Sequence, residues 1–455
     1  MPRKSVRRTA IRTVPAPADR PADDEIWPRV TRELADDLAV DAPARDRAGK
    51  APFDEVARLQ EAGLPALLTA PGANRRGADW RAASAVVREI SAADSSVGEL
   101  LAHHYVLSWS SRFFGRAEHT EGTEYAEGRE ATEGTERTED APARDLDVRT
   151  AEEHWLLGGG VEPPRTEKDP GLRLTPDAGG WILDGRRAFA SGVAVADRLV
   201  VGARPGGTGD WLIVLVDPAH PGVFTDAGTD RIGQRLSGAG TVTFDHVPVP
   251  ADQVLGLLPH DEHAVTPFAT LAPLALRLLL AQVGLGIAEG ALAEARDISR
   301  AGQAGPAPAP SADGRPSTAG ADLLAADDDP YLLLAYGELA TAAHAASAVV
   351  ERATDALARG LLTGRTLSPE ERADIAVLVS AAETITGRAA VRITTRVLEL
   401  VDGAEGADTR SGGPGFDRFW RNARALTAHT QPAHRLRDIG DHYLNGTHAR
   451  LTLPA

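Results

Sequence analysis

Residues 240–249, GTVTFDHVPV, alternate apolar and polar side chains, as a β-strand with one buried face does. Asp184-Gly185 lies between two shorter apolar segments and predicts a hairpin turn. Further short apolar segments follow at 199–203 and 211–216. Several short strands with turn signals between them predict a small antiparallel β domain.

Helical patterns flank this domain on both sides. Apolar side chains recur every three or four residues within 24–115, and Asp94 with the two serines after it predicts a helix start. Beyond the strands, 268–300 predicts one long helix or two helices broken at its glycines, and Ser368 opens a capping box. The order of elements is helices, strands, helices, so the predicted fold class is α+β.

These patterns divide the chain into four parts. They are a disordered tail (1–22), an N-terminal helical domain (23–154), a central β domain (155–255) and a C-terminal helical domain (256–455). Within the first helical domain, Glu recurs at every third position from 118 to 139, which predicts a solvated, mobile, low-complexity acidic insertion over 116–150. Within the last domain, 301–322 is a Pro/Ala-rich loop.

Composition excludes several classes of protein. A net charge of −16 disfavours nucleic acid and anionic membranes as partners. The absence of cysteine excludes disulfides, thiolate metal sites and a cysteine nucleophile. No apolar segment follows the basic N-terminus, so we expect no export signal and a cytoplasmic protein. The apolar run 271–288 contains Arg277 and Gln282, which favours a buried core helix over a membrane span.

Motifs for several common chemistries are missing from the sequence. It has no GxGxxG after a strand, P-loop, HExxH or GxSxG, so NAD on a Rossmann unit, ATP on a P-loop, zincin chemistry and the α/β-hydrolase elbow lose support. His434, Asp438 and His442 could share a helix face, but the outer two would lie about 12 Å apart along the axis, too far for one ion. We therefore predict no metal site.

The segment 415–446 is the densest cluster of Arg, His, Asp and aromatic residues in the chain. Such a mixture is more typical of a segment that lines a site than of a core helix. Two parts of it, DRFWRNARALTAH (417–429) and LRDIGDHYLNG (436–446), together with DDPYLLLAYGEL (328–339), resemble one branch of the acyl-CoA dehydrogenase superfamily. That branch is the reduced-flavin-dependent monooxygenases, which include dibenzothiophene monooxygenase. FASG (189–192) and QRLSGAGTVTFDHVPVP (234–250) resemble flavin-contacting and domain-closing segments of the superfamily.

The resemblance implies an acyl-CoA dehydrogenase-like fold, with an N-terminal helical domain, a central β domain and a C-terminal four-helix bundle. It implies a two-component monooxygenase, in which a separate flavin reductase supplies reduced FMN, or FADH₂, by diffusion. A flavin C4a-hydroperoxide formed with O₂ would then transfer one oxygen atom to a small, largely apolar substrate. It also implies a homotetramer with flavin sites near the subunit interfaces.

Candidate catalytic residues follow from the same resemblance. His429 matches a catalytic histidine, and an imidazole can stabilise a peroxide or shuttle its proton near neutral pH. A dehydrogenase of this fold would need a carboxylate base, but no acidic residue lies between Asp417 and Asp438. His103 and His104 lie on the helix expected to form a wall of the substrate pocket, where either could assist.

Candidate cofactor-binding residues also match the family. Ser191 matches a serine near the reactive edge of the flavin. Ser237, Gly238 and Gly240 match a turn that lets the backbone approach the cofactor closely. Arg315 matches an arginine that binds the flavin phosphate from a neighbouring subunit, in keeping with the anion chemistry of guanidinium.

The sequence departs from the family at the predicted pocket. Where the branch often has an asparagine, WLLGGGVEPP (155–164) offers only glycines, and Glu99 and His103 take the places of a histidine and a tyrosine. The substrate therefore does not carry over from the relatives. Two alternatives stay open: an acyl-CoA dehydrogenase or oxidase with Glu289 or Glu338 as a relocated base, and a catalytically silent scaffold.

Overall fold

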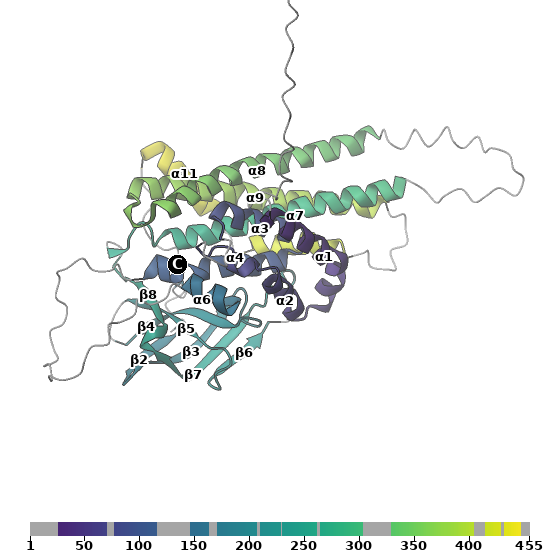
Figure 1. Cartoon of the computed structure of the whole chain (residues 1–455). Coiled ribbons are helices and arrows are strands. Elements are labelled where there is room, and N and C mark those ends of the chain that lie inside the picture. The colour runs from purple at the N-terminus through teal and green to yellow at the C-terminus, as the bar shows by residue number, and fades with distance from the viewer. Residues whose placement is uncertain are drawn as a thin grey trace, which may run out of the picture.

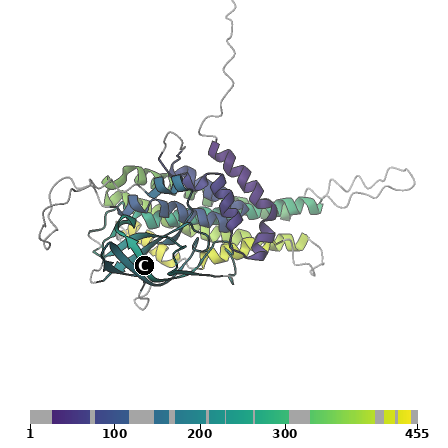
Figure 2. The same cartoon turned by 60° about the horizontal axis from the view of Figure 1, so that its bottom comes forward.

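The computed structural model describes residues 26–70, 77–115, 146–162, 171–206, 210–228, 230–261, 264–303, 329–404, 415–428 and 432–446. Helices form the upper layers of the molecule, and a β domain lies beneath them (Figure 1). When the bottom is turned forward, the sheet lies in front of the helices (Figure 2). One large apolar core joins the helices to one face of the sheet, and a second core lies within the β domain. The predicted α+β class is confirmed.

Among the described residues, six helices precede the sheet: α1 (Ile26–Ala48), α2 (Phe53–Glu61), α3 (Trp80–Ala93), α4 (Ser95–Ser108), α5 (Ser110–Phe114) and α6 (Leu146–Glu153). The predicted helix start at Asp94 is confirmed, since its carboxylate accepts hydrogen bonds from the backbone N–H groups of Ser96 and Val97. Asp94 is also the only residue between α3 and α4.

Helix α6 corrects one end of the predicted insertion. Residues 116–145 lie outside the described part of the chain, but 146–150 form the start of α6 and are not a solvated, mobile segment. Leu146 and Asp147 are buried, and Arg112 Nη2 donates to Asp147 Oδ2 at 2.7 Å. A single leucine among polar residues has no periodic pattern, so only tertiary contacts reveal that this turn is packed.

Eight strands of the described chain form the sheet, in the order β6-β7-β3-β2-β4-β5-β8, with β1 pairing in parallel with β4. They are β1 (Leu157–Gly160), β2 (Arg173–Asp177), β3 (Gly180–Phe189), β4 (Arg198–Pro205), β5 (Trp211–Val216), β6 (Val223–Ala227), β7 (Gly240–Pro250) and β8 (Val254–Leu258). Antiparallel pairs predominate, as predicted, but β2 also pairs in parallel with β4.

The predicted hairpin turn at Asp184-Gly185 is wrong. Strand β3 runs through both residues, and its register against β7 shifts between Leu183 and Gly185. Gly185 has φ +130°, and Asp184 Oδ1 accepts a hydrogen bond from His246 N at 2.8 Å across this bulge. The turn between β2 and β3 lies at 178–179 instead. A glycine with positive φ serves a bulge as well as a turn, so the dipeptide alone does not distinguish them.

In the part of the chain that the structure describes, five helices follow the sheet: α7 (Leu271–Gln303), α8 (Pro330–Thr363), α9 (Pro369–Ala404), α10 (Asp417–Thr427) and α11 (Pro432–Asn445). Of the two predictions for α7, the single continuous helix is correct. Its glycines serve helix packing: a Cβ on Gly286 would lie 2.5 Å from Arg88 O, and one on Gly290 would lie 2.1 Å from Ala92 O. The two glycines therefore let α3 and α7 meet at backbone contact.

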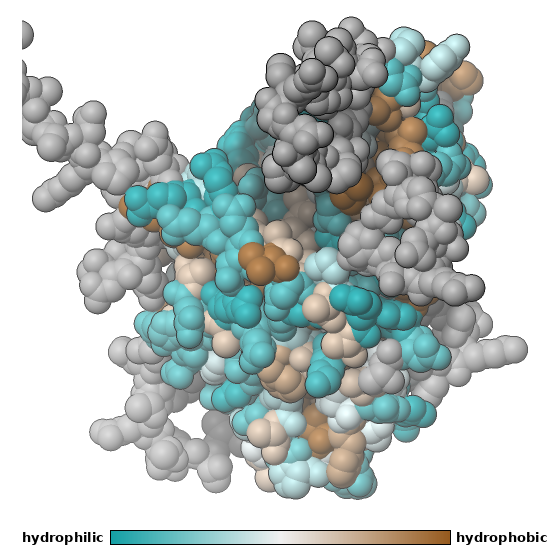
Figure 3. All heavy atoms as spheres, turned by 90° about the vertical axis from the view of Figure 1, so that its right-hand side faces the viewer, coloured by the Kyte–Doolittle hydropathy of each residue, from teal (hydrophilic) through white to brown (hydrophobic). Residues whose placement is uncertain are grey.

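Helices α7 and α8 are both long and apolar enough to cross a membrane by length and composition. In α7, 83% of the most apolar window is buried inside the protein, which confirms the predicted core helix. In α8 only 22% is buried, and Tyr331, Leu333 and Leu334 are exposed. Hydrophobic side chains also gather on the face of the molecule where α8 begins (Figure 3). Helix α8 thus presents apolar surface that one chain leaves uncovered.

Candidate active site

The two predicted cofactor-binding serines lie together beneath the helices. Ser191 Oγ donates to Ser237 O at 3.1 Å, and Gly192 N donates to the same carbonyl oxygen at 2.8 Å. Both serines are fully buried. Gly238 has φ +62°, a conformation that favours glycine, and its carbonyl accepts from Ala194 N at 3.0 Å. The structure therefore joins segments 189–192 and 234–240 in one turn-rich unit, which we call the serine unit. Gly240, at the end of this unit, is the first residue of β7.

Strand β1 packs directly on this unit. A Cβ on Gly158 would lie 2.8 Å from the carbonyl carbon of Gly192, and one on Gly159, which has φ +115°, would lie 2.3 Å from Val200 O. The glycines of the WLLGGGVEPP segment are thus required where backbone meets backbone. Their lack of side chains reflects this packing.

His104 connects α4 to two loops through both of its ring nitrogens. Its Nε2 lies 2.8 Å from Pro65 O, and its Nδ1 accepts from Leu157 N at 3.0 Å, so the proton is on Nε2. The side chain is fully buried, and burial lowers the pKa of His104 to about 4, against the hydrogen bond to Pro65. His104 therefore stays neutral and positions β1 against α4, with neither nitrogen available for proton transfer.

His103, on the adjacent position of α4, is different. Its Nε2 has no hydrogen-bond partner within the described residues and lies 4.0 Å from Glu99 Oε1, one helical turn away. Glu99 is only 6% exposed, and its Oε2 also has no partner there. Burial lowers the pKa of His103 to about 4, opposed by Glu162, and raises the pKa of Glu99 to about 7, opposed by Arg231.

Arg231 links this pair to the serine unit. Its Nη1 donates to Ser237 Oγ at 2.9 Å and to Ala190 O at 3.2 Å, while its charge acts on Glu99. Glu99, His103, Arg231 and Ser237 therefore converge from α4 and from the loop before β7. Sequence reasoning noted Glu99 only as a departure from the family. Its spacing of four residues from His103 was the available signal, because that spacing puts both side chains on one face of α4.

Helix α10 holds the same loop from the other side. Gln234 N donates to Asn422 Oδ1 at 2.8 Å, and Asn422 Nδ2 donates to Ser95 Oγ at 2.9 Å. Ser95 and Ser96 donate in turn to Gln234 Oε1, at 3.2 and 3.1 Å. Gln234 adopts φ 53°, a conformation that a buried network must hold in place. We call these four residues the Asn422 clamp.

The remaining polar residues of α10 also form structural contacts. Arg418 is buried and donates to Glu294 at 3.0 Å, and Arg421 donates to Ile232 O at 3.0 Å and pairs with Asp46. The Arg-rich cluster that the sequence suggested as a site lining thus orients the loop that carries Arg231 and Ser237. His429 and Arg315, the other two predicted site residues, lie outside the described residues.

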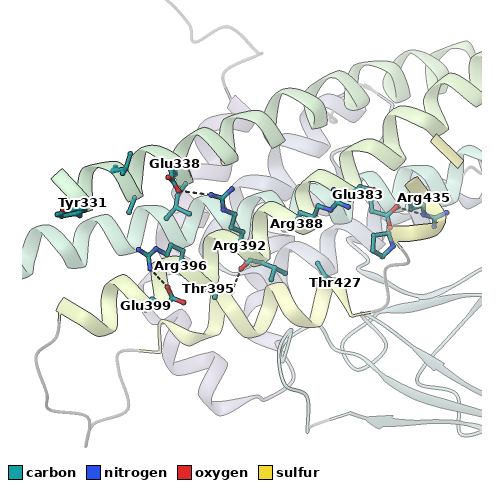
Figure 4. A pocket seen from close by; sticks show the side chains of 17 residues that line it. Tyr331, Glu338, Glu383, Arg388, Arg392, Thr395, Arg396, Glu399, Thr427 and Arg435 are labelled. Atoms are coloured by element: carbon teal, nitrogen blue, oxygen red, sulfur yellow. Dashed lines mark hydrogen bonds and ion pairs between the residues drawn. The ribbon is translucent and has the colours of Figure 1, made fainter. Parts of the chain in front are cut away.

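The two carboxylates that could replace a dehydrogenase base are both paired. Glu289 Oε2 accepts from Arg88 Nε at 2.8 Å, and Glu338 accepts from Arg392 at 3.3 Å. Glu338 is exposed and lines a cavity along α8 and α9 (Figure 4).

That cavity, of about 970 Å³, lies between α8, α9, α10 and α11 and is separate from the Glu99 and Ser237 cluster. Figure 4 shows Arg388, Arg392 and Arg396 of α9 along it, with Tyr331 at the α8 end. Its lining combines apolar residues with ion pairs that are already complete, such as Arg396–Glu399 at 2.7 Å. Of the residues predicted for the flavin site, those that the structure describes do not line it.

Known proteins are similar to this chain over nearly its whole length. Residues 278–433 match the family described as acyl-CoA dehydrogenase, C-terminal domain. Dibenzothiophene monooxygenase of Rhodococcus erythropolis is 31% identical over 94% of this chain and 95% of its own length. The probable FMNH₂-dependent monooxygenase SfnC of Pseudomonas putida is 28% identical over 91% of this chain and 94% of its own.

Comparison with solved structures leads to the same group of proteins. The crystal structure of FMN-bound TdsC from Paenibacillus sp. A11-2 matches with a TM-score of 0.76 and 28% identity, covering 95% of this chain and 100% of TdsC. The predicted fold and the predicted branch are both confirmed. The chain belongs to the acyl-CoA dehydrogenase superfamily, in its branch of reduced-flavin-dependent monooxygenases.

Proposed function

We propose that this chain is the oxygenase component of a two-component system. A separate flavin reductase supplies reduced FMN, and the chain uses it with O₂ to add one oxygen atom to a small substrate. The convergence of Glu99, His103, Arg231 and Ser237 between α4 and the sheet supports this most directly. A cytoplasmic location is part of the proposal, since the reductase must deliver reduced flavin before O₂ oxidises it.

The residues of this cluster fit a flavin. Ser191 Oγ and Ser237 Oγ donate their protons to Ser237 O and Ala190 O, so each oxygen retains a lone pair that can accept from a flavin N–H. Glu99 Oε2 and His103 Nε2 are buried polar atoms without partners in the described part of the chain, as expected of groups that face a ligand. When bound, reduced FMN supplies the electrons that activate O₂. FADH₂ is the alternative cofactor.

Binding of reduced flavin is the decisive measurement. Anaerobic titration of the protein with photoreduced FMN, followed by absorbance and fluorescence, should give saturable binding that is tighter than for oxidised FMN. When that complex is mixed rapidly with O₂, the bound flavin should be oxidised more slowly than free FMNH₂. A protein that binds no reduced flavin would refute the proposal. Tight binding of oxidised FAD that an acyl-CoA reduces would establish the dehydrogenase alternative.

We propose His429 as the residue that moves a proton during oxygen transfer, with His103 as the assisting base. Two observations support this: α10 ends two residues before His429 and is fixed by the Asn422 clamp, and burial keeps the His103 imidazole neutral. His429→Ala should lower product formation by about 10²-fold or more and release hydrogen peroxide instead. The matched control is His434→Ala, at an exposed position of α11. Unchanged product yield in His429→Ala would contradict this role.

Arg315 is proposed to bind the flavin phosphate of a neighbouring subunit. Riboflavin lacks that phosphate and provides the control. Arg315→Ala should weaken binding of FMN but leave binding of riboflavin unchanged. Equal losses for both flavins would show that Arg315 acts through the fold.

We propose that a second copy of the chain covers α8, within a homotetramer. Tyr331, Leu333 and Leu334 are 81%, 58% and 62% exposed in one chain, next to the cavity between α8 and α9. Light scattering during gel filtration should give a tetramer for the natural chain and smaller species for Leu334→Asp. A monomer at micromolar concentration, or a Leu334→Asp tetramer, would contradict the proposal.

A further inference from the structure

Glu99 is the side chain at the candidate site that the resemblance leaves without a role. It lies on α4 with 6% of its surface exposed, among the apolar residues that pack α4 against the sheet. A buried carboxylic acid normally has hydrogen-bond partners for both oxygens. Here Oε2 has none within the described residues, and Oε1 lies 4.0 Å from His103 Nε2, beyond hydrogen-bond distance. A shared proton between the two side chains therefore does not account for Glu99.

The charged groups near Glu99 favour the binding of a cation. Two carboxylates act at this place, Glu99 and Glu162, and His103 is neutral. Arg231 is the cation whose charge acts on Glu99, and its guanidinium also binds Ala190 O and Ser237 Oγ. When Glu99 is ionised, Arg231 acts on its charge, but Glu99 Oε2 still has no hydrogen-bond donor within the described residues. A ligand with a positive charge and N–H donors would supply Glu99 with both a counter-charge and hydrogen bonds.

We infer that Glu99 recognises the substrate, and that the substrate carries a basic amine nitrogen on an otherwise apolar body. This inference rests on the proposed function and specifies its substrate class. An alkylammonium group would give the buried carboxylate both a counter-charge and hydrogen-bond donors, whereas a sulfur heterocycle or hydrocarbon would offer neither. The apolar part of such a substrate would lie against the apolar side chains between α4 and the sheet.

Two probes that differ only in the polar group test this inference. Calorimetric titration of the FMN-loaded enzyme with 2-phenylethylamine and with 2-phenylethanol at pH 8 should show at least tenfold tighter binding of the amine. Glu99→Gln keeps the size and polarity of the side chain but removes its charge, and should abolish the preference. Glu61→Gln, at an exposed position of α2, removes one carboxylate elsewhere and should retain it.

Further measurements distinguish a failure of this inference from a failure of the proposed function. Glu99→Met should bind the alcohol at least as well as the natural chain does, and its thermal midpoint and circular dichroism show whether the variant is folded. The amine preference should also shrink at pH 6, where Glu99 gains a proton beside His103, Glu162 and Arg231. Equal affinities for the two probes, or a preference that survives in Glu99→Gln, would overturn the inference while FMN binding continued to support the proposed function. Loss of all flavin binding in the natural chain would overturn both.

Discussion

Substitution of Asn422 by alanine tests whether α10 holds the loop that carries Ser237. The side chain is 6% exposed, accepts from Gln234 N and donates to Ser95 Oγ. Ser95 keeps its contact with Gln234 Oε1 after the change, so Gln234 N is the group that loses its hydrogen-bond partner. A buried donor without a partner costs about 1–3 kcal/mol. The free energy of unfolding should therefore fall by about 2 kcal/mol, with a somewhat larger loss if the space left by the side chain stays empty.

The matched control is Arg424→Ala, on the exposed face of the same helix, which should change stability by less than about 0.5 kcal/mol. Urea unfolding gives the stabilities, and fluorescence titration gives the affinity for FMN, which should fall about tenfold in Asn422→Ala. A double-mutant cycle with Ser95→Ala should show coupling of about 1 kcal/mol, because the two side chains share a hydrogen bond. Stability equal to that of Arg424→Ala would refute the clamp. Lost stability with unchanged FMN affinity would refute its influence on the flavin loop.

Three further predictions concern stability. Gly290→Ala should weaken the contact between α3 and α7 by more than about 2 kcal/mol in urea unfolding, because its Cβ would lie 2.1 Å from Ala92 O. Acid should destabilise the fold through His104, whose pKa of about 4 in the folded chain lies below its ordinary value near 6.5, so the unfolded chain binds the proton first. Between pH 6.5 and 4, the contribution of His104 to the free energy of unfolding should fall by about 3 kcal/mol. Glu99 titrates in the opposite direction, so the measurement compares Glu99→Gln with Glu99→Gln/His104→Gln, in which Glu99 no longer titrates. Ser368→Ala should cost about 1 kcal/mol, seen as a lower thermal midpoint.

Local signals predicted those elements whose structure depends on a few neighbouring residues. Asp94 caps α4 as its sequence indicates, and Ser368 forms the expected reciprocal contacts with Glu371, at 3.0 and 3.2 Å. The same reasoning failed at Asp184-Gly185, because a bulge and a turn use the same residues. It also failed at 146–150, where burial comes from contacts with distant residues.

At the candidate site, the sequence could not separate His103 from His104. The two are adjacent, yet His104 is held by Pro65 and Leu157, which are 39 and 53 positions away in the chain. Glu99 was harder to find, since its spacing of four residues from His103 is the one signal that marks this acid on an apolar helix. The sequence predicted that the Arg-rich segment of α10 lines a site, whereas the contacts of Arg418 with Glu294 and of Arg421 with Asp46 join elements of the fold.

The Asn422 clamp also determines when the site can form. Its bonds join Gln234 to a residue 188 positions later, and that residue to Ser95, 327 positions earlier. Contacts between such distant residues form late, because the chain between them must first lose its freedom. The turn that carries Ser237 therefore reaches its final shape only after α10, near the end of the chain, has docked. A nascent chain, or one cut before residue 417, would have the β domain without a finished site.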